Sequence, residues 1–128
     1  VVGFSQRAEG VIADFGASID MPGLPRSPDG SYTIAFQRAG VMSLTPSQDG
    51  KRTIVSLTRK PAHPPLAEDL KRLFDVAQLD PVTRFPVSAG LSADNAFILA
   101  MSVDDADFTL QSLEAAIDRL IQLFEGES

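Results

Sequence analysis

The chain has 128 residues, of which 44% are hydrophobic and 22% are charged, and it contains no cysteine. This composition supplies enough apolar surface for one core, so we expect a single domain over residues 1–128 that folds without disulfides or a structural metal. The net charge of −6 argues against a nucleic-acid-binding surface, which needs clustered Lys and Arg, and favours a basic partner.

The first 30 residues predict a helix followed by a loop. Apolar residues recur at intervals of three and four between Phe4 and Phe15, so they share one helical stripe. The next segment, "MPGLPRSPDG" (residues 21–30), holds three prolines and two glycines. It therefore predicts a loop that crosses the surface.

Three strands are predicted next. Residues 31–37 alternate between two faces, which is typical of a strand with one buried face. Residues 41–45 and 52–58 have the composition of the second and third strands. Between them, the dipeptide Asp49-Gly50 tolerates the positive φ that a tight hairpin needs.

The second half of the chain predicts a helix, a hairpin and a closing helix. After a proline-rich crossover, residues 66–77 have helical spacing. Residues 85–92 and 96–103 flank the turn "ADN" and predict a hairpin whose later strand is apolar on both faces, as in strands that are covered on both sides. Residues 110–124 place their apolar side chains on one helical face. This order predicts an α+β fold, α-β-β-β-α-β-β-α, with helices packed on an antiparallel sheet.

Three acids, Asp104, Asp105 and Asp107, stand between the last strand and the last helix. We interpret them as a helix start, because Asp107 or Thr109 can cap the first N–H groups and nearby acids favour the positive end of the helix. A calcium loop would need oxygen ligands at set spacing, a glycine and a distal Glu, and the sequence here lacks them. We therefore predict no metal site in this segment.

No residue pattern predicts an enzyme. His63 is the only histidine and stands among prolines, which excludes a two-His metal site. A Ser-His-Asp arrangement is conceivable, but the sequence has no Gly-x-Ser-x-Gly elbow. The glycines form no phosphate-cradling motif, so we predict no cofactor. The residues describe a small acidic binding domain, and turnover that is abolished by changing His63 would be the sign of an enzyme.

The sequence also predicts where the protein is found. No apolar run approaches the roughly 20 residues that span a bilayer, and the N-terminus lacks a basic segment followed by a hydrophobic stretch. The absence of cysteine fits a reducing compartment. We therefore expect a soluble cytoplasmic protein. Because the chain opens at Val1 and not at Met, we also expect a few native residues to precede it.

The order and spacing of these elements resemble a known family. The segments that carry the resemblance are "GLPRSPDGSYTIAF", "SQDGKRTIVSL", "LAEDLKRLFDVAQL" and "GLSADNAFILAMSVDDADFTLQSLEAAIDRLIQLF". Together they look like a class I type III secretion chaperone of the Tir-chaperone (CesT-like) family over almost the entire chain. There are two departures: Gln78 follows Ala77 where the family often has Ala-Asn, and Pro61, Pro64 and Pro65 stiffen the crossover.

The resemblance implies a homodimer in the bacterial cytoplasm, without ATP or a cofactor. The homodimer would hold the N-terminal region of a secreted effector in an extended form, keep it soluble and have the secretion apparatus as a further partner. Family analogy gives the region of the dimer interface and periodicity gives the faces. The interface residues expected on this basis are Leu70, Leu73, Phe74 and Val87.

The resemblance also implies an effector groove where the first helix meets the first strands. The expected contacts are Val11, Phe15, Tyr32, Phe36 and Leu44. Each of these residues could equally belong to an ordinary core. The alternative function is that of an orphan α+β domain for another protein or a small apolar ligand. A ligand-binding domain should be monomeric with a closed cavity, whereas a chaperone should dimerise and expose grooves.

Overall fold

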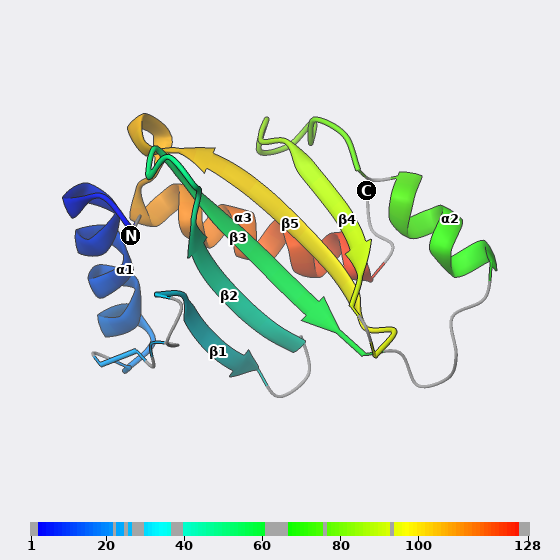
Figure 1. Ribbon diagram of the computed structural model, residues 1–128, viewed down its shortest axis with the longest axis horizontal. Helices are drawn as coiled ribbons and strands as arrows, with labels where there is room; N and C mark the ends of the chain where they lie inside the picture. The colour runs from blue at the N-terminus through cyan, green and yellow to red at the C-terminus, as the bar shows by residue number, and fades with distance from the viewer. Residues whose placement is uncertain are drawn as a thin grey trace.

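The computed structural model describes residues 3–21, 23–24, 26, 30–36, 40–60, 67–75, 77–92 and 94–125, of which Asp69 and Leu73 are described by their backbone alone. The elements, in chain order, are α1 (Gln6–Ser18), β1 (Tyr32–Phe36), β2 (Gly40–Pro46), β3 (Arg52–Arg59), α2 (Ala67–Asp75), β4 (Val87–Leu91), β5 (Phe97–Asp104), η1 (Asp105–Asp107) and α3 (Leu110–Phe124). Figure 1 shows α1 and α2 at opposite ends of the sheet and α3 behind it. The predicted α+β class and element order are confirmed.

One antiparallel sheet has the strand order β1-β2-β3-β5-β4. The chain leaves β3, passes through α2, forms the edge strand β4 and returns beside β3 as β5. The hairpin between β2 and β3 turns at Gly50, whose φ of 70° confirms the positive φ predicted there. At the edges of the sheet, Arg26 bridges Tyr32 at the start of β1, and the segment before β4 folds back onto it through a Leu79–Pro86 bridge and a hydrogen bond from the Val87 N–H to the Gln78 carbonyl. Beyond these contacts, no described strand pairs with the outer edges of β1 and β4.

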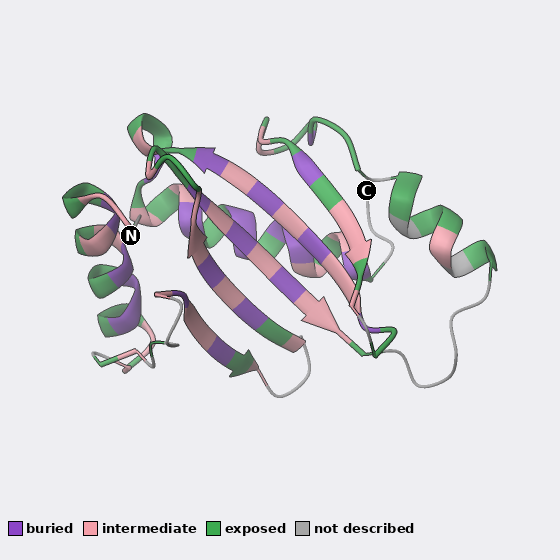
Figure 2. Ribbon diagram, viewed as in Figure 1, coloured by how far each residue is buried: buried purple, intermediate pink, exposed green. Residues whose placement is uncertain are grey.

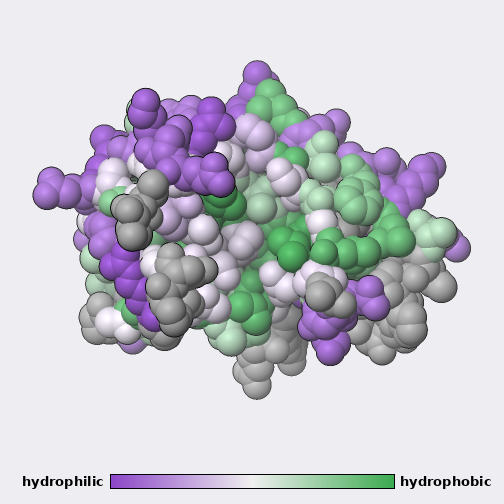
Figure 3. All heavy atoms as spheres, viewed as in Figure 1, coloured by the Kyte–Doolittle hydropathy of each residue, from purple (hydrophilic) through white to green (hydrophobic). Residues whose placement is uncertain are grey.

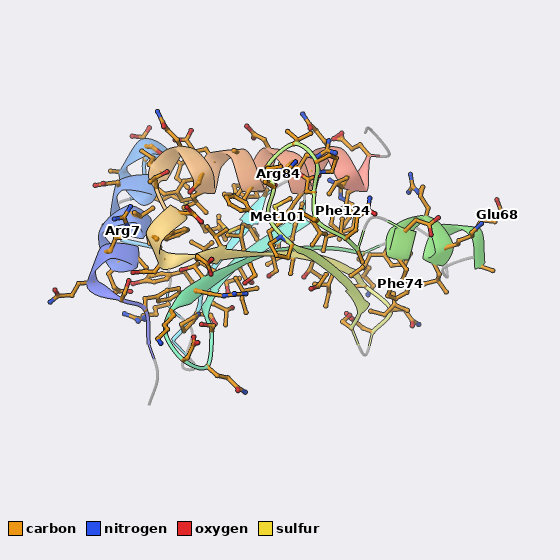
Figure 4. The ribbon with its side chains drawn as sticks, turned by 90° about the horizontal axis from the view of Figure 1, so that it is seen from above. Arg7, Glu68, Phe74, Arg84, Met101 and Phe124 are labelled. Atoms are coloured by element: carbon orange, nitrogen blue, oxygen red, sulfur yellow. The ribbon has the colours of Figure 1, made fainter. Side chains whose placement is uncertain are left out.

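The two faces of the sheet differ in character. One row of paired residues crosses all five strands on the inner face: Tyr32, Leu44, Val55, Met101 and Val87. Helices α1 and α3 lie over this face, as the view from above shows (Figure 4). All but Tyr32 are buried, so this row runs through the core.

The outer face carries small side chains. Its central row is Thr33, Ser43, Ser56, Ala100 and Ser88. Buried and half-buried residues alternate along β2, β3 and β5 (Figure 2), and no described helix covers this side. We predicted that β5 would be covered on both faces. Helices of the same chain cover its inner face, and no described helix covers its outer face.

The acids before α3 anchor two elements. Thr109 is the N-cap of α3 and forms a capping box with Ser112, so the Thr109 alternative is confirmed and Asp107 is not the cap. Asp104 pairs with Arg52 at 2.8 Å. Asp105 accepts a hydrogen bond from the hydroxyl of Ser5, whose oxygen caps α1, at 2.5 Å.

A buried ion pair ties the loop before β4 to α3. Arg119 Nε donates to Asp80 Oδ1 at 2.9 Å, and both side chains are almost fully buried. The other carboxylate oxygen of Asp80 accepts from the backbone N–H and hydroxyl of Thr83. Burial by itself would raise the pKa of Asp80, but these hydrogen bonds outweigh it and hold the pKa below its usual value.

Candidate functional site

An open apolar groove of about 380 Å³ lies where α1, the end of β1 and α3 meet. Its lining residues are Phe15, Ile19, Phe36, Glu114, Ile117, Asp118 and Ile121. The groove arises from helical spacing. Phe15 on α1 and Ile19, the C-cap of α1, are four residues apart, and the α3 residues recur at intervals of three and four, so both helices turn one face toward the groove.

The rim of the groove is acidic. Glu114 and Asp118 are exposed side chains one turn apart on α3, whereas Phe36 and the isoleucines provide apolar surface below them. Among the described residues, neither acid has an ion-pair or hydrogen-bond partner. The groove therefore joins an apolar floor to a negative edge that no described residue compensates.

A smaller hollow of about 240 Å³ adjoins β1 at Tyr32. The Tyr32 hydroxyl donates to Glu9 at 3.2 Å, and the Arg26 guanidinium lies 5.0 Å from the centre of the Tyr32 ring. Burial, followed by the Glu9 carboxylate, raises the pKa of Tyr32. Arg26 also forms a single antiparallel bridge with Tyr32, on the side of β1 away from β2. The outer edge of β1 at Thr33–Phe36 has no partner among the described residues.

The five expected groove residues occupy different positions. Phe15 and Phe36 line the groove at α3, and Tyr32 lines the hollow beside it. Val11 is half-buried against the core, and Leu44 is completely buried beneath it. Of the expected contacts, Phe15 and Phe36 line the same groove, whereas Leu44 is a core residue with no exposed surface.

The α3 side of the groove was missed. Ile117 and Ile121 were assigned to the apolar face of the last helix, and Glu114 and Asp118 to positions off that face. The sequence signal that could have found this side of the groove was the width of the apolar stripe on the helix, because a wide stripe need not be buried along its whole width. In the structure Ile117 is buried, whereas Ile121 stays partly exposed. Only the tertiary fold brings these residues beside Phe36, which is about 80 positions earlier in the chain.

A third hollow, about 510 Å³, lies between α3 and the loop before β4. Val82, Phe85 and Ala115 give it apolar walls, and Arg119 lies at its base. Because Arg119 is bound to Asp80 and to Gln122, its charge is already compensated inside the protein. Asp118 borders both this hollow and the apolar groove.

Exposed apolar side chains gather around α2 and β4. Among the described residues, five large hydrophobic side chains are exposed, between 38% and 64%: Val41, Phe74, Leu79, Val82 and Leu91. Four of them belong to the segment from α2 to the end of β4. Figure 3 shows hydrophobic atoms on the outer face over the sheet and toward this end of the molecule.

The expected interface residues agree with this surface in part. Phe74 is about half exposed and Leu70 is half-buried on α2. Val87 is buried on the inner face of the sheet and is already covered within its own chain. The side chain of Leu73 lies outside the described residues, as does the whole of His63.

The described residues contain no cluster of three or more His, Cys, Asp or Glu side chains that could hold a metal ion. Within the same part of the chain, no helix is both long enough and apolar enough to cross a membrane.

Comparison with known proteins places the chain in a family. Residues 10–126 match the model of the Tir chaperone protein (CesT) family. No curated protein sequence matches the chain.

Solved structures share the fold at low sequence identity. The complex of ExsC and ExsE is 17% identical, with a TM-score of 0.76 over 98% of this chain and 93% of that chain. The Yersinia pestis type III secretion chaperone SycH, in complex with a stable fragment of YscM2, is 12% identical, with a TM-score of 0.71 over 94% and 99%. The HopA1–SchA chaperone–effector complex is 14% identical, with a TM-score of 0.70 over 94% and 91%.

Proposed function

This chain belongs to the Tir chaperone (CesT) family, and we propose that it is a type III secretion chaperone that binds the N-terminal region of an effector in an extended form. In this role it keeps the effector soluble and competent for secretion. Residues 1–128 form a single chaperone domain that acts in the bacterial cytoplasm, before the effector enters the secretion apparatus. Structural relatives described as chaperone–effector complexes support this proposal. The family is one of chaperones, not of enzymes.

The observation that carries the proposal is an apolar groove beside a free strand edge. An extended peptide that pairs with the outer edge of β1 at Thr33–Phe36 would send alternate side chains to the inner side of the sheet. There the groove beside Phe36 can take an apolar side chain. Main-chain pairing supplies affinity for an extended chain, and the groove selects its side chains.

The proposed contacts follow from this geometry. Phe15 and Phe36 touch the bound segment directly, and Tyr32 and Val11 border it. Leu44 supports the groove from the core and contacts the segment only if the sheet opens locally. The α3 residues Ile117 and Ile121 complete the contact surface.

We also propose a homodimer through α2 and the neighbouring β4 edge. Phe74, Leu79 and Leu91 leave apolar surface in water at this end of the molecule. A second copy would bury it, as in obligate dimers whose interfaces resemble a core cut in half. Leu70 and Leu73 belong to the same proposed interface, and Val87 supports it from the core side.

Co-expression with the N-terminal region of an effector from the same bacterium tests the function. The two proteins should co-purify, and an effector without that region should not. Ile121→Ala and Phe36→Ala should each weaken binding by about 1 to 3 kcal/mol, the scale of an interface hot spot. Val82→Ala is the matched control, because Val82 is an exposed apolar residue in the loop before β4, outside the groove.

The competing function, a binding domain for a small apolar ligand, gives a different result. The groove is large enough for one, since ligand pockets span roughly 300–1,000 Å³. In that case no effector region would co-purify, and a monomer would retain full ligand binding. Equal effector binding by the wild-type protein and both groove variants would place the effector site elsewhere.

A further inference from the structure

The acidic rim of the groove carries an inference about the bound segment. Exposed acids are common on this protein, but Glu114 and Asp118 both line the apolar groove itself. They are four residues apart on α3, so their like charges repel and destabilise the helix slightly. No described cation relieves this repulsion, since the adjacent Arg119 points to Asp80 and Gln122.

We propose that the segment held in this groove carries Lys or Arg beside its apolar anchor, and that Glu114 and Asp118 bind this basic residue. The inference rests on the proposed function and specifies its partner: a basic amphipathic segment of an effector. The apolar floor receives the anchor, whereas the long stem of Lys or Arg can cross apolar surface and bring its charge to the rim.

The same rim selects against acidic segments. A Glu or Asp beside the anchor would face two carboxylates, and like charges across an interface disfavour a partner. The net charge of −6 attracts basic segments over longer distances, whereas the two rim acids are the charged residues of the described groove lining and act at the groove itself. The local effect can therefore be separated from the overall charge by experiment.

Two short synthetic peptides provide the probe. Both contain leucine and threonine at the same alternating positions, and they differ only in carrying lysines or glutamates at the remaining positions. Binding of each peptide is measured by fluorescence anisotropy to the full chain and to three variants. These are Glu114→Gln/Asp118→Asn at the rim, Glu68→Gln/Asp75→Asn on α2 and Ile121→Ala in the floor.

The α2 variant is the matched control. It removes the same two negative charges from exposed helical positions. Figure 4 shows Glu68 at the far end of α2, well away from α1 and α3. A decrease in affinity that follows only from lower net charge should be the same in both neutralised variants.

The proposal predicts that the wild-type protein prefers the lysine peptide. The rim variant should lose about three- to tenfold in affinity for it, the scale of two partly exposed charge pairs, and the α2 variant much less. Equal losses in the two neutralised variants, with weaker binding of both peptides to Ile121→Ala, would overturn the inference and leave the groove as the binding site. If neither peptide binds, or if Ile121→Ala changes nothing, both the inference and the proposed groove are wrong.

Discussion

At the scale of single residues, the Asp80–Arg119 pair makes the clearest prediction about stability. Arg119→Met leaves the Asp80 carboxylate buried with only Thr83 to bind it. Loss of one partner of a buried ion pair costs about 3–5 kcal/mol, which should appear as a lower urea midpoint. The double variant Asp80→Leu/Arg119→Met should recover much of this loss, because no charge stays buried. If the single variant were as stable as the wild type, the pair would not anchor this loop.

The same carboxylate predicts a pH dependence. The pKa of Asp80 is lower in the folded protein than the ordinary value of about 3.9, so ionised Asp80 favours the folded state above that pH. This contribution is lost as the pH falls toward the folded-state pKa. The difference in unfolding free energy between wild type and Asp80→Asn should therefore be constant from neutral pH to about pH 4 and narrow below it. A difference that widened on acidification would contradict the direction of the pKa shift.

The start of α3 offers a matched pair of substitutions. Thr109→Ala removes the N-cap and half of the capping box, and should cost about 1 kcal/mol. Asp107→Ala removes an exposed acid that is not the N-cap of α3. It should therefore change the free energy of unfolding by at most a few tenths of the loss expected for Thr109→Ala. Thermal unfolding of the two variants measures both. Equal destabilisation would mean that charge near the helix start, and not the cap, stabilises α3.

At the scale of elements, α2 should determine the oligomeric state. Phe74→Glu places a charge on apolar surface that already faces water in the single chain. The variant should stay folded and be monomeric at protein concentrations of tens of micromolar, because the charge lies within the proposed interface and weakens the dimer. Light scattering measures the mass, and circular dichroism checks the fold. A wild-type protein that is monomeric at this concentration would contradict the proposed interface.

The elements were largely predictable, because each follows from short-range pattern. Residues 110–124 were predicted to be helical and match α3, since a stripe of apolar residues and a capping threonine mark both its face and its start. Residues 66–77 were predicted to be helical, and α2 spans Ala67–Asp75, so the helix ends before Ala77. Its apolar residues Leu70, Leu73 and Phe74 were expected at a dimer interface, and Phe74 is about half exposed in the single chain.

The sheet order and the α3 side of the groove could not be predicted, because both depend on contacts between distant segments. Nothing local to β3 indicates that it pairs with β5 across a helix and an edge strand. Likewise, Ile121 looks like any core residue of an amphipathic helix until Phe36 is placed beside it. The five expected contacts therefore included Leu44, which is core, and omitted α3.

At the scale of the whole molecule, one scaffold carries two separate surfaces. The α1–β1–α3 end offers the groove and a free strand edge, and the opposite end offers α2 and the exposed residues around β4 (Figure 1). Because the two surfaces lie at opposite ends, a dimer could bind effector on both of its outer ends. Disruption of one surface should then leave the other usable.

Hydrogen exchange, measured by mass spectrometry on the chain alone and on its complex with a co-purified effector segment, tests the central claim most directly. The outward-facing amides of an edge strand exchange readily unless another strand pairs with them. Exchange should slow in β1 at Thr33–Phe36 and in the groove-lining parts of α1 and α3 when the segment is bound. Unchanged exchange in β1, with protection confined to other elements, would contradict this claim.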